Sequence, residues 1–189
     1  MNILLVGLGR WGEKHLRVLG ELGVTLWAAD VSPARLAWAV RHGVDPKRAI
    51  ADFRVALHEV DAVDIITSAD SHYPVARACL AAGRHCFVEK PLARTVAEGT
   101  AMVEAAKKAG RVLKVVFNHR ERGDVAVLKH QIDEGLLGRV YYAKAHWMRR
   151  NGIPGMGGWF TNRELSGGGP LIDLGVHILD MALHLMGEF

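Results

Sequence analysis

The sequence predicts an α/β fold with a parallel sheet in its N-terminal part, on three observations. Short apolar runs alternate with amphipathic stretches of helical length from Met1 to about Phe117. Glycines 23, 43, 83 and 110 each stand just past a helical pattern, where a left-handed C-cap residue is favoured. Half of the 189 residues are hydrophobic, which is enough for a sizeable core.

The individual elements follow from apolar periodicity and from capping residues. Ser32 and Pro33 are typical of an N-cap followed by the first helical position. After Asn118 the pattern changes to a helix from Val125 to Leu136, a long alternating strand over 139–149 and a helix over 170–186. Before Asn118, we expect strands at 2–6, 24–29, 48–50, 63–67, 85–88 and 112–116, and helices at 10–21, 33–42, 52–58, 72–82 and 95–109.

A glycine triplet stands between the first expected strand and the first expected helix. Gly7, Gly9 and Gly12 have the spacing G-x-G-x-x-G. The first glycine allows a tight turn, the second lets backbone approach a pyrophosphate, and the third allows close helix packing. An acidic residue, Asp30, ends the second apolar run. We therefore predict a dinucleotide site, rather than a ligand-free turn, formed by Gly7, Leu8, Gly9, Arg10, Trp11, Gly12, Asp30 and Arg35.

Small polar residues follow the strand expected at 63–67, at the edge where such sheets bind ligands. Thr67, Ser68 and His72 are predicted to contact the cofactor, because small side chains there allow a nicotinamide ribose to approach. The alternative is an ordinary loop in which Asp70 or Ser71 caps the next helix.

A second polar segment, Glu89-Lys90-Pro91, follows the strand expected at 85–88. A residue before proline is held out of the helical region, which directs the Lys90 side chain towards the ligand cleft. We predict that Glu89 and Lys90 contact the cofactor; the alternative is a surface lysine.

The last expected helix carries two acid and histidine pairs at helical spacing. Asp173 and His177 share a face, which Asp180 and His184 continue. A carboxylate one turn from an imidazole orients it and favours its protonated form. The alternative is that the pairs have no catalytic role, and that Asp173 in the first turn and His184 in the last turn interact favourably with the helix dipole. Metal binding is a poor interpretation, since one helix rarely completes a coordination shell, so we predict no metal.

Composition and charge exclude several classes of partner. The net charge is +4 with basic residues scattered, which argues against a nucleic-acid partner. No apolar run is long enough to cross a membrane, and Met1-Asn2 leads directly into the first strand, so we expect neither a membrane partner nor a signal peptide. Cys79 and Cys86 are interpreted as reduced, packed thiols of a cytoplasmic protein.

Four motifs together resemble the glucose–fructose oxidoreductase and inositol dehydrogenase (Gfo/Idh/MocA) family: G-L-G-R-W-G at 7–12, V-E-K-P-L at 88–92, F-N-H-R at 117–120 and G-G-G-P-L-I-D-L-G-V-H-I-L-D at 167–180. The resemblance implies an NAD(P)-dependent oxidoreductase that transfers a hydride between nicotinamide and a secondary alcohol of a sugar, cyclitol or related polyol. It implies a dinucleotide-binding Rossmann domain over 1–118 and the first part of an α+β substrate and oligomerisation domain over 119–189. We therefore expect a truncated part of a longer protein.

The resemblance also implies roles for individual residues. The family's active-site lysine falls on Lys90, and its acid and histidine pair falls on Asp173 and His177. We expect His177 to be the acid/base, Asp173 to orient it, and Lys90, before a cis peptide bond, to stabilise developing alkoxide charge. Arg149, Arg150, Trp159 and Arg163 are further candidates for the substrate pocket.

Cofactor choice and assembly complete these expectations. Asp30 favours NAD over NADP because it repels a 2′-phosphate, although Arg10 and Arg35 leave NADP possible. We expect a homo-oligomer through the C-terminal sheet, with Tyr141, Ala143, Ala145 and Trp147 facing helices and the face of Tyr142 meeting another subunit. The alternative functions are an NAD-dependent glycosidase and a non-catalytic NAD(P)- or sugar-sensing regulator.

Overall fold

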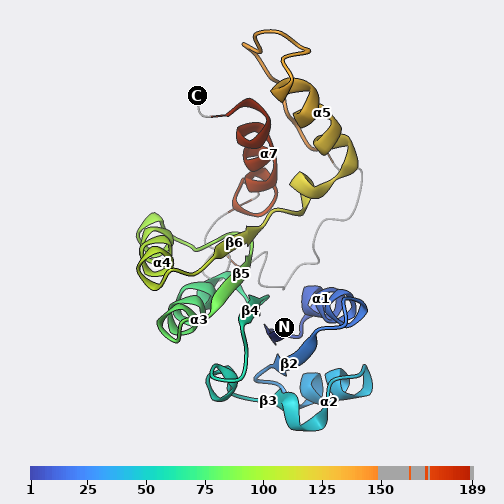
Figure 1. The fold of residues 1–189 in the computed structure, drawn as a ribbon, viewed down its shortest axis with the longest axis vertical. Coiled ribbons are helices and arrows are strands. Elements are labelled where there is room, and N and C mark those ends of the chain that lie inside the picture. Colours follow the sequence, from blue (N-terminus) through green and yellow to red (C-terminus); the bar gives the residue numbers. More distant parts are fainter. Residues whose placement is uncertain (149–161, 163–168, 170, 188–189) are drawn as a thin grey trace. The chain divides into compact units, whose positions relative to one another are not determined.

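The computed structural model describes residues 1–148, 162, 169 and 171–187 in two compact units, 1–115 and 116–189, which are described separately. The first unit is built on a six-stranded sheet in the order β3-β2-β1-β4-β5-β6 (Figure 1). Strand β1 pairs in parallel with both β2 and β4, so the predicted α/β fold is confirmed. The strands are β1 (Asn2–Val6), β2 (Thr25–Ala29), β3 (Ala49–Ile50), β4 (Ala62–Ile65), β5 (His85–Glu89) and β6 (Leu113–Val116).

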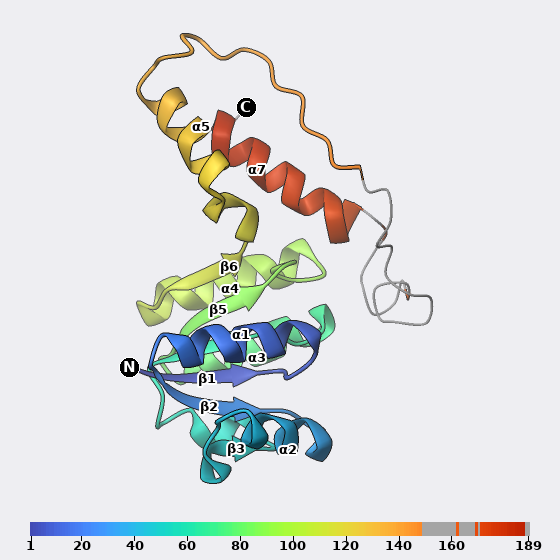
Figure 2. The same ribbon diagram turned by 90° about the vertical axis from the view of Figure 1, so that its right-hand side faces the viewer.

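Helices α1 to α4 cover the two faces of this sheet (Figures 1 and 2). Helices α1 (Arg10–Glu21) and α2 (Pro33–Arg41) lie on one face, and α3 (Ala69–Ala81) and α4 (Val96–Ala109) lie on the other. Side chains alternate along β1, so Leu5 packs under α1 and α2 while Leu4 packs against α3 and α4. Helix α4 has 14 residues, and no helix in the described parts of the chain is long and apolar enough to cross a bilayer.

Two predicted helices differ from the structure because of local polar contacts. The helix expected at 72–82 begins at Ala69, since Ser68 is the extended N-cap residue and accepts hydrogen bonds from the backbone and hydroxyl of Ser71. The helix expected at 52–58 is a 3₁₀ turn, Phe53–Ala56. There the Asp52 carboxylate accepts the Arg54 N–H at 3.0 Å, which stabilises a tight turn instead of a longer helix.

The regular elements described in the second unit beyond β6 are helices and helical turns. It contains the 3₁₀ turn η3 (Asn118–Glu121), helix α5 (Gly123–Asp133), the π-helical turn η5 (Leu171–Gly175) and helix α7 (Val176–Met186). The helix expected over 170–186 is therefore divided at Gly175.

The strand predicted over 139–149 is wrong for the part that the structure describes, 139–148. A strand needs hydrogen bonds from a neighbouring strand, and no described residue beyond β6 belongs to one. Tyr141 and Tyr142 are both exposed, so the predicted division of this segment into an inner and an outer face is not observed either.

A partly buried histidine and a buried carboxylate join α1 to the central strand β4. Nδ1 of His15 lies 2.7 Å from Oδ2 of Asp64, which is 4% exposed. Burial lowers the pKa of His15, but the hydrogen bond and charge of Asp64, together with the charge of Glu89, outweigh burial and raise this pKa above its usual value. Burial raises the pKa of Asp64, and His15 opposes that effect. The pair fixes α1 on the sheet one turn after the glycine loop.

We expect the free energy of unfolding to fall as the pH rises through the folded-state pKa of His15. The stabilisation from its raised pKa is fully present below the unfolded pKa of about 6.5 and is lost as the histidine deprotonates in the folded chain. Urea unfolding between about pH 6 and pH 9 measures this dependence. His15→Gln should reduce the fall, while His58→Gln, at an exposed histidine, should match the wild type. Equal pH dependence in His15→Gln and wild type would contradict the role given to this pair.

Candidate functional site

The glycine loop between β1 and α1 is shaped by two close backbone approaches. Gly7 has a φ of +97°, and a Cβ atom there would lie 2.7 Å from the carbonyl oxygen of Ile66. A Cβ atom on Gly12 would lie 2.1 Å from the carbonyl oxygen of Gly7. Neither position accepts a side chain without moving backbone, so both glycines are required by the loop itself.

Gly9 differs, because a Cβ atom there would meet no protein atom within 4 Å. Gly9 is also the N-cap residue of α1 and has no side chain to accept hydrogen bonds from the first turn. The first N–H groups of a helix lack partners within the helix and lie at the positive end of its dipole. Exposed backbone donors beside an open position fit the pyrophosphate of a dinucleotide, so the residues present suit this cofactor.

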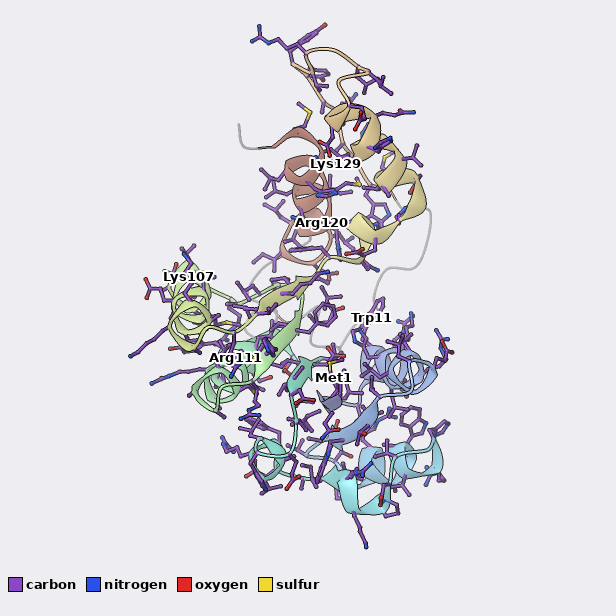
Figure 3. All side chains as sticks on the ribbon, viewed as in Figure 1. Met1, Trp11, Lys107, Arg111, Arg120 and Lys129 are labelled. Carbon is purple, nitrogen blue, oxygen red and sulfur yellow. The ribbon has the colours of Figure 1, made fainter. Side chains whose placement is uncertain are left out.

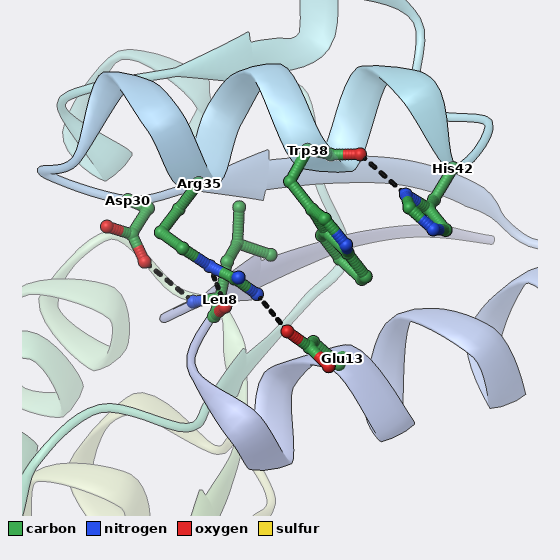
Figure 4. A network of polar contacts seen from close by, with 6 residues as sticks. All are labelled: Leu8, Glu13, Asp30, Arg35, Trp38 and His42. Carbon is green, nitrogen blue, oxygen red and sulfur yellow. Dashed lines mark hydrogen bonds and ion pairs between the residues drawn. The ribbon is translucent and has the colours of Figure 1, made fainter.

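A polar network holds the middle of the loop at Leu8 (Figure 4). Oδ2 of Asp30 accepts the Leu8 N–H at 2.7 Å, and Oδ1 accepts the Ser32 N–H at 2.8 Å. Nε of Arg35 donates to the Leu8 carbonyl oxygen at 2.5 Å, and its Nη2 lies 2.7 Å from Oε1 of Glu13. Asp30 thus fixes the loop and keeps further lone pairs as acceptors, while the charge of Arg35 is paired within the protein.

The predicted residues of the first unit gather at the carboxyl edge of the sheet, where parallel sheets bind ligands. Gly7 follows β1 and donates its N–H to Ala29 of β2, and Thr67 follows β4. Arg10 and Trp11 are exposed in the first turn of α1, where Nζ of Lys14 lies 4.1 Å from the centre of the Trp11 ring. Figure 3 labels Trp11 on this helix. The residues at this edge or in the helical turns that begin there are Gly7, Leu8, Gly9, Arg10, Trp11, Gly12, Asp30, Arg35, Thr67, Ser68, His72, Glu89 and Lys90.

Lys90 lies directly after β5, and its peptide bond to Pro91 is cis, as expected. The Lys90 backbone N–H donates to Oε2 of Glu89 at 2.8 Å. Burial raises the pKa of Glu89, with the Lys90 charge opposing. The Glu89 carboxylate is thus turned back on the Lys90 backbone, which fixes the start of this loop.

His72 is buried in α3, and its ring faces two backbone carbonyls. Nδ1 lies 2.8 Å from the Pro91 oxygen and Nε2 lies 3.0 Å from the Thr67 oxygen. The expected contact of His72 with the cofactor stays a prediction, and the structure places both ring nitrogens beside backbone oxygens of the two loops. The sequence carried no signal for this bridge beyond the polar segment itself.

In the second unit, the candidate acid/base His177 is buried on α7 among aromatic rings. Its ring centre lies 4.9 Å from that of His119, 6.0 Å from that of Trp147 and 6.1 Å from that of Phe117. Asp173 lies in the π-helical turn before α7, so its role towards His177 stays a prediction. The substrate-pocket candidates Arg149, Arg150, Trp159 and Arg163 lie outside the described residues.

A bidentate ion pair fixes α7 to the turn at η3. Arg120, labelled in Figure 3, donates from Nε to Oδ2 of Asp180 at 2.7 Å and from Nη2 to Oδ1 at 2.5 Å. Asp180 is 8% exposed, so the pair is largely desolvated on the carboxylate side. Sequence reasoning placed Asp180 and His177 on one face but missed Arg120 and the aromatic cluster; the F-N-H-R motif was the available signal.

Comparison with known proteins assigns both parts of the chain. Residues 1–117 match the family described as "Oxidoreductase family, NAD-binding Rossmann fold", which confirms the predicted cofactor class, and residues 125–189 match the "GFO/IDH/MocA C-terminal domain". Levoglucosan dehydrogenase of Pseudarthrobacter phenanthrenivorans is 32% identical over 202 residues, which cover 100% of this chain and 52% of that protein. D-glucoside 3-dehydrogenase of Escherichia coli (strain K12) is 42% identical over 127 residues, covering 67% of this chain and 36% of that protein.

A solved structure agrees with these matches. Levoglucosan dehydrogenase in complex with NADH and levoglucosan has a TM-score of 0.85 at 30% identity, covering 100% of this chain and 55% of that one. The chain therefore spans about half the length of these levoglucosan dehydrogenase relatives, although the whole of the chain aligns with them.

The two glycines at the start of α1 should respond differently to alanine. Gly12→Ala should lower the free energy of unfolding by about 1–3 kcal/mol, because its methyl group overlaps the Gly7 carbonyl. Gly9→Ala should change stability by less than about 0.5 kcal/mol yet weaken NADH binding at least about tenfold, since its methyl group would enter the open space beside the first-turn N–H groups. Urea unfolding and NADH fluorescence titration measure the two effects. Wild-type NADH affinity in Gly9→Ala would contradict the assignment.

Proposed function

The chain belongs to the GFO/IDH/MocA family of oxidoreductases, and on this premise we propose that it acts as an NAD(P)-dependent dehydrogenase or reductase. The reaction transfers a hydride between nicotinamide and a secondary alcohol of a sugar, cyclitol or related polyol. The glycine loop is the observation that carries this proposal, because it offers open helix-terminal donors at the sheet edge that also holds Lys90. The matched dehydrogenases of levoglucosan and D-glucosides support the substrate class.

The first unit holds the cofactor in this proposal. The first-turn N–H groups of α1 bind the pyrophosphate, and the Asp30 carboxylate accepts a ribose hydroxyl with the lone pairs that Leu8 and Ser32 leave. Nicotinamide, when bound, accepts or returns the hydride. Pairing of Arg35 with Glu13 leaves its charge less available to a 2′-phosphate, which supports NAD over NADP.

Three side chains supply the remaining chemistry. The Lys90 ammonium donates a hydrogen bond to the reacting oxygen and stabilises alkoxide charge as the hydride leaves carbon. The His177 imidazole takes the hydroxyl proton during oxidation and returns it during reduction, and Asp173 orients the ring. The Arg120–Asp180 pair fixes α7, and the rings of Phe117 and Trp147 restrict the rotation of His177.

We further propose a division of roles and a setting for the protein. Residues 1–118 bind the cofactor, and residues 119–189 contribute to the substrate side and to assembly. Cys79 and Cys86 are free and buried, as suits the reducing cytoplasm. Tyr141, Tyr142 and Met148 are exposed and offer apolar surface to a second copy of the chain in a homo-oligomer.

We expect NADH to bind more tightly than NADPH, because a 2′-phosphate would meet the Asp30 carboxylate while Arg35 is neutralised by Glu13. Fluorescence titration of both cofactors gives the dissociation constant of NADPH divided by that of NADH, a ratio that should exceed one. Glu13→Gln removes the counter-charge of Arg35 without touching Asp30, so it should lower this ratio several-fold. Glu21→Gln, which loses a comparable ion pair to Arg17 on the same helix, should not change it. Tighter binding of NADPH by the wild type would overturn the expected preference.

The proposed activity is tested by cofactor reduction with a panel of polyols and sugars. Lys90→Ala should lower kcat by about 10²–10³, the loss typical of one donor to a developing oxyanion, while the NADH dissociation constant changes much less. Lys47→Ala, at an exposed lysine, should behave as the wild type. Absence of cofactor reduction with every member of the panel would refute the function. Loss of NADH binding with unchanged single-turnover chemistry would instead give Lys90 a cofactor role.

A further inference from the structure

One buried side chain contacts both of the polar loops that follow strands β4 and β5. His72 is 1% exposed, and its Nδ1 and Nε2 lie 2.8 Å and 3.0 Å from the carbonyl oxygens of Pro91 and Thr67. We infer that His72 is the positioning residue for the nicotinamide end of the site, because its ring sets the spacing between the loop at Thr67 and the loop at Lys90. This inference rests on the function proposed above.

The two loops need such a spacer because they extend past the hydrogen-bonded part of the sheet. Strand β4 ends at Ile65 and β5 ends at Glu89, so backbone pairing between the strands no longer sets the distance between residues beyond them. The aromatic ring is rigid and contacts both loops at once. A displacement of about 1 Å in a positioning group is enough to cost roughly 10²-fold in rate, so this spacing matters for the chemistry.

Both partners of His72 are backbone oxygens, which accept hydrogen bonds and cannot donate them. A neutral imidazole donates one hydrogen bond and an imidazolium donates two. Burial lowers the pKa of His72, the two carbonyls and the charge of Asp70 raise it, and the charge of Lys90 lowers it. The imidazolium donates to both carbonyls, whereas the neutral ring donates to one and only contacts the other, so in either state the ring itself keeps its full width between the loops.

The experiment compares two ligands that differ at the nicotinamide end. Calorimetric titration gives the affinities for NADH and for ADP-ribose, which has the pyrophosphate and both riboses but no nicotinamide. In His72→Phe, which keeps a ring but removes both ring nitrogens, we expect NADH affinity to fall by about tenfold more than ADP-ribose affinity. His72→Asn keeps a donor near the position of Nδ1, and His72→Gln keeps one near the position of Nε2, so each should restore part of the loss.

A matched control removes a histidine–backbone bond elsewhere. Nδ1 of His85 accepts the Val112 N–H at 3.0 Å at the opposite end of β5, so His85→Phe should keep the wild-type ratio of the two affinities. Thermal unfolding of every variant separates stability from binding. A role in stability alone would leave the ratio unchanged in His72→Phe, and this result would overturn the inference.

The remaining outcomes are also decisive. If His72→Phe does not fold, the Asn and Gln variants decide, and a wild-type ratio in both would overturn the inference. A wild type that binds neither NADH nor NADPH would refute the proposed function itself. A wild type that binds NADH, with unchanged ratios in the His72 variants, would refute only the role of His72.

Discussion

The contact on which the first unit depends is the approach of Gly12 to the Gly7 carbonyl, where a Cβ atom would lie 2.1 Å from the oxygen. Because of this approach, α1 begins directly after the end of β1, with Gly9 as its N-cap residue. It also brings His15 over the sheet, where the bond to Asp64 fixes the helix on β4. One steric constraint therefore determines the position of α1, the geometry of its N-terminal N–H groups and the packing of one sheet face.

The sequence predicted the first unit well because its signals are local. The glycine spacing, the apolar strands and the capping residues each act within a few residues, and the structure has them near the expected positions. Bridges such as His72 to Thr67 and Pro91 depend on which loops the topology brings together, and no periodic pattern encodes that. The family resemblance implied roles for Lys90 and His177, but it did not indicate that aromatic rings surround His177 or that Arg120 pairs with Asp180 on the same helix.

The second unit shows the limit of pattern reading. Residues 139–148 alternate as a strand does, yet alternation only makes a segment suitable for a sheet, and pairing must come from another segment. The helix after Gly169 is similar: its apolar spacing predicted one regular helix, whereas the chain forms a π-helical turn before α7. The Arg120–Asp180 pair anchors α7 irrespective of that irregular start, because it acts on the following turn.

The double engagement of Asp30 has a consequence for protein engineering. Exchange of the acidic residue after β2 is an obvious route to altered cofactor choice, but here the same carboxylate fixes Leu8 and Ser32. Its replacement would loosen the glycine loop while changing selectivity, so gains in one property would be offset by losses in the other. Directed evolution of this chain towards a phosphorylated cofactor therefore has a less costly starting point at Glu13, whose exchange frees Nη2 of Arg35 while leaving the bond from its Nε to Leu8.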